Sequence, residues 1–422
     1  MKKLVLLQLV LLPLWLMAQP LQKLTLNEAY DLSEKNYPAV KQKELIRQTA
    51  AINLENLHKG FLPQFSLNGQ ATYQSDVTSV PVSLPGLSID PPSKDQYKVV
   101  ADVSQLIFDG GLTKEQKNLQ QLNATVEEQK VEVELYKLRE RISQLYLGVL
   151  YLDEQLKQVE LVKQDIQTGI NRIEAQVQNG VAFRSNLNML KAEQLKAGQR
   201  AIEIRASKKG LLDVLSLFTG KEFMQDIVFE KPVFSGALVQ EHIERPELRL
   251  FAEQQKQVGM QERLIIAKNL PKASLFAQGG YGRLGLNMLL NEFDFFYISG
   301  IRLNWSLGGL YTKKKEKEQV AVNKKMVEVQ KETFLLNTNT QLKQQKTEIE
   351  KLEQLIASDN EIIALRKSVT DAAKAQLENG VITANDYLKE INAEDQARQV
   401  QITHQVQLLQ ARVNYQTILG KQ

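Results

Sequence analysis

Two halves of this chain repeat the same turn residues in the same order, about 200 residues apart, and this repetition restricts the fold more than any other feature. Two prolines of the first half recur 208 residues later, and two glycine turns recur 200 residues later. The matched pairs are Pro38 with Pro246, Pro63 with Pro271, Asn179-Gly180-Val181 with Asn379-Gly380-Val381, and Gly220-Lys221 with Gly420-Lys421. Landmarks at a nearly constant offset indicate an internal duplication, so the chain is predicted to build one architecture twice.

Each repeat contains two short stretches in which apolar or small residues alternate with polar ones. A period of two indicates a β-strand. We expect a β-hairpin at about residues 64–108 and a second at about 273–307, the first with a proline-containing loop. The alternating positions are Phe65, Leu67, Gly69, Ala71 and Tyr73, then Tyr97, Val99, Ala101, Val103 and Ile107, and in the second repeat Ala273, Leu275, Ala277, Gly279 and Tyr281, then Phe293, Phe295, Tyr297, Ile301, Leu303 and Trp305.

A glycine pair follows each hairpin, and the apolar spacing then alternates between three and four residues. This spacing is typical of coiled-coil helices. It predicts long helices at about 112–177 and 310–377, each followed by a helix, at about 183–218 and 383–418. The first long helix would extend for about 100 Å. Each Asn-Gly turn would end a long helix, because glycine adopts the left-handed conformation at little cost.

The first 18 residues are predicted to be a signal peptide. Lys2 and Lys3 precede a mostly apolar segment of 15 residues that ends at Ala18. A helix of this length spans about 22 Å and is shorter than the hydrocarbon core of about 30 Å. Cleavage after Ala18 is therefore expected, and an uncleaved membrane anchor is the alternative. The first repeat would then cover residues 19–220, an inter-repeat linker 221–244, and the second repeat 245–422.

Composition excludes several classes of protein. Charged residues make up 24% of the chain and hydrophobic residues 43%, which argues against both a disordered chain and a bundle of membrane-spanning helices. Cysteine is absent, which excludes disulfides, thiolate metal sites and cysteine nucleophiles. The net charge of +4 is too small to indicate nucleic-acid binding. The three histidines are scattered, and no catalytic constellation has a supporting context, so we expect neither an enzyme nor a cofactor or metal site.

Strands of about ten residues are long enough to cross an outer membrane in a tilted barrel, and aromatic residues gather near their ends. The same pattern also suits the core of a small β-sandwich. Four strands cannot close a barrel, and unpaired edges are not tolerated in lipid. Strands in a membrane would therefore require oligomerisation, with eight strands in a dimer or twelve in a trimer. The long helices would continue such a barrel as a second tube, which suggests a conduit.

The repeat landmarks resemble those of the TolC-like outer-membrane efflux proteins over nearly the whole chain. No single motif is specific, but their order, duplication and spacing together are. The motifs that carry the resemblance are Leu24-Thr25-Leu26-Asn27-Glu28-Ala29, Asn36-Tyr37-Pro38, Leu62-Pro63, Phe108-Asp109-Gly110-Gly111, Arg245-Pro246-Glu247-Leu248, Leu303-Asn304-Trp305-Ser306-Leu307-Gly308-Gly309 and the two Asn-Gly-Val turns.

The resemblance implies a mainly α-helical fold with a membrane β-barrel portion. Three chains would form a homotrimer with a 12-stranded β-barrel, four strands from each chain, continuous with a periplasmic α-helical barrel. It further implies a location in the outer membrane, in contact with its lipid, and a passive channel that carries substrates outward in a tripartite efflux pump or a type I secretion system. A periplasmic adaptor and an inner-membrane transporter of the RND or ABC type would be its partners. A secreted coiled-coil scaffold without channel activity is the alternative.

The resemblance also implies where the functional residues lie. Asn179, Gly180 and Val181 with Asn379, Gly380 and Val381 correspond to the periplasmic tips, where adaptors dock and the channel closes.

Asp386 corresponds to an acid that often lines the constriction of the pore in this family. The second acid that the family's best-studied members carry one turn later is replaced by Lys389, with Glu390 next to it. Ile382 stands where these members carry an arginine, so the usual latch is not expected. Three copies of Asp386 around an axis would repel each other, raise one another's pKa and attract cations.

Overall fold

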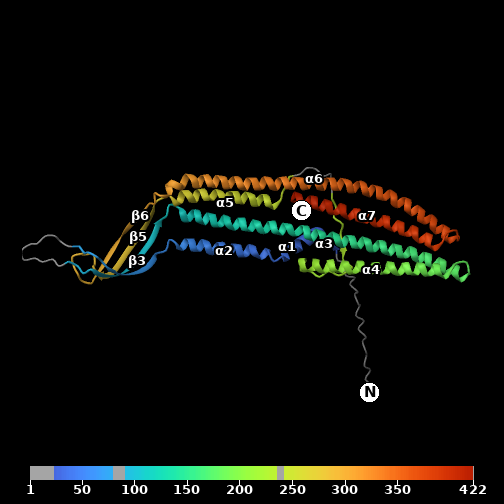
Figure 1. The fold of residues 1–422 in the computed structure, drawn as a ribbon, viewed down its shortest axis with the longest axis horizontal. Coiled ribbons are helices and arrows are strands. Elements are labelled where there is room, and N and C mark those ends of the chain that lie inside the picture. The colour runs from blue at the N-terminus through green and yellow to red at the C-terminus, as the bar shows by residue number, and fades with distance from the viewer. Residues whose placement is uncertain (1–22, 79–90, 235–241, 422) are drawn as a thin grey trace, which may run out of the picture. The chain divides into compact units, whose positions relative to one another are not determined.

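The computed structural model describes residues 23–78, 91–234 and 242–421 (Figure 1). The predicted signal peptide, residues 1–18, lies outside the described residues. The elements in chain order are β1 (Lys23–Leu24), α1 (Leu26–Asn36), α2 (Val40–Lys59), β2 (Gln64–Tyr73), β3 (Asp95–Phe108), α3 (Leu112–Gln178), α4 (Arg184–Thr219), β4 (Val228–Phe229), α5 (Pro246–Lys268), β5 (Lys272–Arg283), β6 (Asp294–Asn304), α6 (Gly309–Glu378) and α7 (Ala384–Leu419).

The described residues form two compact units, and each unit takes segments from both predicted repeats. The first unit contains residues 23–37, 135–234, 242–244 and 338–421. The second contains residues 38–78, 91–134 and 245–337. The predicted repeat boundaries at residues 220 and 245 describe the duplication along the sequence and stay a prediction. The compact units divide the chain differently, because equivalent segments of the two repeats pack together within each unit.

The second unit contains a four-stranded antiparallel sheet in the order β2-β3-β5-β6. Each predicted hairpin supplies one pair, and β3 and β5 join the two hairpins from Tyr97 opposite Arg283 to Phe108 opposite Ala273. A bulge interrupts the register between Leu106 and Phe108. Within the described residues, β2 and β6 each pair on one side only. The sheet therefore has two open edges.

The alternation along the strands gives this sheet one apolar and one polar face, because paired residues share a face. On the apolar face, Leu67 lies opposite Ala101, and Gly279 lies opposite Tyr297. Side chains there are strongly exposed, including Phe65, Leu67, Phe295, Tyr297 and Ile301 at 72–81%. On the other face, Ser66 lies opposite Asp102, and Asp102 lies opposite Gln278. An exposed apolar face of this kind is suited to lipid.

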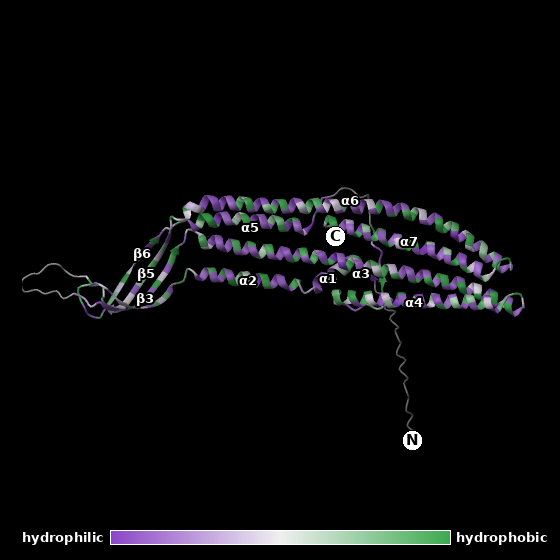
Figure 2. Ribbon diagram, viewed as in Figure 1, coloured by the Kyte–Doolittle hydropathy of each residue, from purple (hydrophilic) through white to green (hydrophobic). Residues whose placement is uncertain are grey.

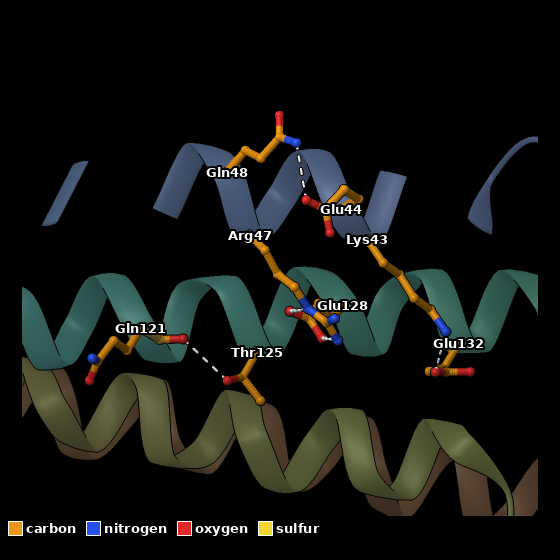
Figure 3. A network of polar contacts seen from close by, with 8 residues as sticks. All are labelled: Lys43, Glu44, Arg47, Gln48, Gln121, Thr125, Glu128 and Glu132. Atoms are coloured by element: carbon orange, nitrogen blue, oxygen red, sulfur yellow. Dashed lines mark hydrogen bonds and ion pairs between the residues drawn. The ribbon is translucent and has the colours of Figure 1, made fainter. Parts of the chain in front are cut away.

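The helices of the second unit follow the same order as its strands. Arg47 of α2 forms two hydrogen bonds with Glu128 of α3, at 3.0 and 3.1 Å, and Lys43 pairs with Glu132 (Figure 3). Gln257 of α5 donates to Asn123 of α3 at 2.8 Å. The rings of Phe251 on α5 and Phe334 on α6 lie 5.8 Å apart. The helix order is thus α2-α3-α5-α6.

The first unit contains the largest buried cores. Beside α3, the hydroxyl oxygen of Tyr146 lies 2.6 Å from the carbonyl oxygen of Leu24 and 2.7 Å from that of Glu230, and its single proton is shared between these two acceptors. These carbonyls belong to the region of the small parallel pair of β1 and β4, which the sequence pattern did not reveal. Ile142, Tyr146 and Leu215 are fully buried around it. The predicted apolar seam of α3 is confirmed by Ile166, Ile170 and Ile173, which are also buried.

Two details differ from the sequence-based expectations. The strand β6 begins after Phe293 and ends before Trp305. The indole of Trp305 donates to the carbonyl oxygen of Asn269 at 3.1 Å, a contact that alternation along a strand cannot reveal. The two glycine pairs also differ, because Gly110 and Gly111 have positive φ angles of 73° and 81°, whereas Gly309 is the first residue of α6.

Hydrophobic and hydrophilic residues are interspersed along the long helices (Figure 2). Among the described residues, no helix is both long and apolar enough to cross a membrane.

Candidate functional site

The first candidate tip is the turn between α3 and α4. Gly180 has a φ of +72°, and the amide of Val181 donates to the carbonyl oxygen of Gln176 at 2.8 Å. The amide of Gly180 donates to Val177 at 3.1 Å. These two bonds satisfy carbonyls that the end of α3 would otherwise leave unpaired, and they define a Schellman motif. Glycine is required there because a side chain disfavours positive φ.

The second tip, between α6 and α7, repeats this geometry. Gly380 has a φ of +70°, and the amide of Val381 donates to Gln376 at 2.9 Å. Asn379 adds a bond from its side-chain amide to Ala375 at 2.8 Å. Val181 and Val381 are 74% and 71% exposed, so both tips present an apolar side chain beside a glycine.

The two tips differ in how the next helix begins. Thr383 caps α7 through a reciprocal arrangement with Asp386, in which the Asp386 amide donates to the Thr383 hydroxyl oxygen at 3.3 Å. The Asp386 carboxylate accepts bonds from the hydroxyl and the amide of Thr383, at 2.7 and 3.1 Å. At the first tip, Phe183 occupies the equivalent position without a side-chain cap and is 80% exposed. The two tips therefore offer different chemistry to a partner.

Hydrogen bonding determines the electrostatics of Asp386 within one chain. The hydroxyl of Thr383, followed by its amide, holds the pKa of Asp386 below its ordinary value, and Lys389 contributes less. The sequence had suggested a raised pKa for three copies around an axis. That expectation concerns an assembly, and in the single chain the capping bonds favour the charged form.

The three predicted pore residues lie on the first turns of α7. Asp386 and Lys389 are exposed, and Glu390 is half-buried. The carboxylate of Glu390 lies 3.6 Å from the guanidinium of Arg366 on α6. The carboxylate of Asp386 thus contacts Thr383, and that of Glu390 contacts α6.

The tips are joined by one apolar cluster. It contains Ile173, Leu187, Leu377, Tyr387 and Leu388, and Ile382 packs against it. The side chain of Gln176 donates to the carbonyl oxygen of Leu377 at 3.3 Å.

An ion pair also crosses between the tips, since the guanidinium of Arg172 lies 3.1 Å from the carboxylate of Glu378. Burial raises the pKa of the Tyr387 hydroxyl to about 12. Sequence reasoning did not assign Phe183, Arg172 or Glu378 to the site. The position of Phe183 directly after a glycine turn was the available signal, whereas the Arg172–Glu378 pair joins distant segments and had none.

The fold, with four antiparallel strands and long paired helices in one chain, is shared with solved outer-membrane channel proteins. The outer membrane protein VceC of Vibrio cholerae shares it, with 15% identity, a TM-score of 0.65, and coverage of 94% of this chain and 96% of that chain. The MtrE outer membrane channel of Neisseria gonorrhoeae has 15% identity and a TM-score of 0.63, and the match covers 94% of this chain and 89% of that chain. CusC has 14% identity and a TM-score of 0.66, and the match covers 94% of this chain and 92% of that chain.

The first half of the chain is similar to the outer membrane efflux protein family. The model of that family, described as "Outer membrane efflux protein", matches residues 29–219, and the fold extends the likeness over the second repeat. No curated protein sequence matches the chain significantly. The predicted resemblance and fold class are therefore confirmed, and the protein is an outer-membrane protein with a large periplasmic helical portion.

Proposed function

We propose that the protein works as a homotrimeric exit duct in the outer membrane. The observation that carries this proposal is the pair of open strand edges on a sheet with one apolar face. Unpaired backbone groups in lipid cost several kcal/mol each, so β2 of one copy would pair with β6 of the next. Three chains give twelve strands, enough to leave a lumen, whereas the eight strands of a dimer would be filled by side chains.

The helices at the same edges support this arrangement. On α2, Leu45 and Ile52 lie seven residues apart and are 59% and 58% exposed. On α6, Val322 and Val329 lie seven residues apart and are 56% and 59% exposed. These spacings are typical of helices that pack against each other. An α2 seam from one copy against an α6 seam from the next would extend the contact between the strands.

The two glycine turns are proposed as the docking site for a periplasmic adaptor and as the place where the channel closes. A Cβ atom added at Gly180 or Gly380 would meet no other atom within 4 Å, and the side chains of Val181 and Val381 are exposed beside these glycines. A partner backbone could therefore approach closely. An inner-membrane transporter of the RND or ABC type would drive export, and the cargo would cross the duct without covalent change.

The test is the mass of the protein in detergent, where three chains per particle are expected. A protein that is soluble and monomeric without detergent would instead support a secreted scaffold. Leu45→Glu with Val329→Glu should prevent assembly, because it places charges in both seams. Ala51→Glu is the matched control, since Ala51 is exposed on α2 outside the Leu45–Ile52 seam. Trimers that persist in the double variant would contradict the proposed interface.

A further inference from the structure

Two phenylalanines lie on the polar face of the sheet, and each has a cation over its ring. The ammonium of Lys98 on β3 lies 4.6 Å from the ring centre of Phe296 on β6. The guanidinium of Arg302 on β6 lies 4.5 Å from the ring centre of Phe276 on β5. A cation over an aromatic face is attracted by the ring but keeps its charge and its N–H donors.

Glycines on the neighbouring strands make room for both rings. Gly280 pairs with Phe296, and a Cβ atom at Gly280 would collide with that ring. Gly300 pairs with Phe276, and a Cβ atom there would lie 3.3 Å from the ring. Lys98 pairs with Gly282 on β5, so its side chain crosses a strand position that lacks a side chain. The two rings and their cations thus lie over glycine positions of the neighbouring strands.

The two acidic side chains on this face, Asp102 and Asp294, accept hydrogen bonds from amide groups and not from the two cations. Asp102 accepts hydrogen bonds from Asn68, at 2.9 Å, and from Gln278. Asp294 accepts from the amide of Phe295 at 2.8 Å. Neither Lys98 nor Arg302 forms an ion pair among the described residues. Asp102 thus accepts from two side-chain amides and Asp294 from one backbone amide, whereas the two cations, which form no ion pair with either acid, stay available to a passing anion.

We propose that Lys98 and Arg302 form a cationic belt on the luminal wall of the barrel that binds organic anions during their passage. The inference rests on the proposed function, because only a closed barrel turns the polar face into a lumen. Three copies place six cations around the pore. The favoured ligand carries carboxylate or sulfonate groups on an aromatic or apolar body, since the charges would meet the cations and the body would lie along Phe276 and Phe296.

Single-channel recording of the trimer in a planar lipid bilayer tests the belt, with naphthalene trisulfonate added as a blocker from the side of the strand loops. Lys98→Gln with Arg302→Gln should weaken block about tenfold, equivalent to about 1.4 kcal/mol. It should also shift the reversal potential in a salt gradient towards cation preference. The charge-preserving pair Lys98→Arg with Arg302→Lys should behave like the unmodified protein. Lys313→Gln with Lys315→Gln removes two cations at the start of α6 and should leave block unchanged.

Chemical modification supplies a second readout. Because the chain has no cysteine, a single introduced cysteine is the only thiol that the reagent can modify. A Lys98→Cys channel should lose block and regain it after reaction with a cationic methanethiosulfonate, but not after reaction with an anionic one. Phe276→Leu with Phe296→Leu keeps both charges and should weaken block about threefold through loss of the rings. Unchanged block in this variant would overturn the role of the rings. Normal conductance with unchanged block and reversal potential in the Lys98→Gln and Arg302→Gln variant would overturn the belt, whereas absence of any channel would count against the proposed function instead.

Discussion

Asp395 on α7 lies 3.0 Å from the guanidinium of Arg200 on α4, and the carboxyl side chain is only 8% exposed. Gln158 on α3 donates to the other carboxylate oxygen at 3.1 Å. One buried carboxylate therefore holds together the α3–α4 hairpin and the helix that follows the second tip. Removal of a buried acid leaves its partners without their acceptor.

Asp395→Ala should therefore loosen the contact between these helices by about 2 kcal/mol. The measurement is hydrogen exchange of α4 and α7, in which exchange should become faster on both helices. Lys196→Ala is the matched control on α4, since it removes only an exposed ion pair with Glu193 and should change little. Equal exchange in the Asp395 variant and the unmodified protein would show that packing alone holds the helices.

Replacement of the tip glycines should block export without preventing assembly. Gly180→Val with Gly380→Val forces a β-branched residue to a φ near +70°, which costs about 1–2 kcal/mol at each turn, and covers the proposed docking surface. Export in cells and trimer mass in detergent are the two measurements. Gly198→Ala is the control, because this glycine is within α4 and a Cβ atom added there would meet no neighbouring atom within 4 Å. Loss of trimers together with export would show that the glycines serve folding only.

Asp386→Asn should reduce cation preference and block by trivalent cations, if three copies of Asp386 surround the pore. Single-channel recording measures both properties. Lys389→Gln should have the opposite effect, because it removes a neighbouring positive charge. Unchanged selectivity and block in the Asp386→Asn channel would mean that this carboxylate serves only as the cap of α7.

The cap formed by Thr383 and Asp386 should make the second tip sensitive to acid. The pKa of Asp386 in the folded chain is below the ordinary value of 3.8, so its stabilisation is present above that value and is lost as the pH falls through the folded pKa. Protection of the amides at the start of α7, measured relative to their intrinsic exchange rate at each pH, should therefore fall below about pH 3.8. The first tip lacks this cap and serves as the internal control. Thr383→Ala should remove the difference between the tips, and a pH effect that survives this substitution would exclude the cap as its cause.

Local patterns were sufficient for the long strands and the long helices of this protein. The alternation from Gln64 to Tyr73 predicted a strand, and β2 has these bounds. The Asn-Gly turns predicted the ends of the long helices, and α3 and α6 end at Gln178 and Glu378. Both signals are local, because side-chain period and the conformational freedom of glycine depend on a few neighbouring residues.

The helical pattern did not reveal which apolar seam is buried. Two heptad series occur along α6, one through Ile349 and Ile363 and one through Leu355 and Ile362. In the structure Ile349 and Ile363 are buried, whereas Leu355 and Ile362 are 37% and 46% exposed. Two seams of equal period are equivalent in sequence, and only the position of the neighbouring helices distinguishes them.

The sequence by itself indicated the resemblance to outer membrane efflux proteins, the order of the long strands and helices, and the two Asn-Gly turns that end the long helices. Tertiary structure decided the pairing of β3 with β5, the contact of Asp395 with Arg200, and the placement of Lys98 over Phe296. The physical reason is the separation along the chain between the residues that make contact. Elements follow from contacts between near neighbours in the chain, whereas Lys98 and Phe296 are 198 residues apart and meet only because two hairpins join into one sheet.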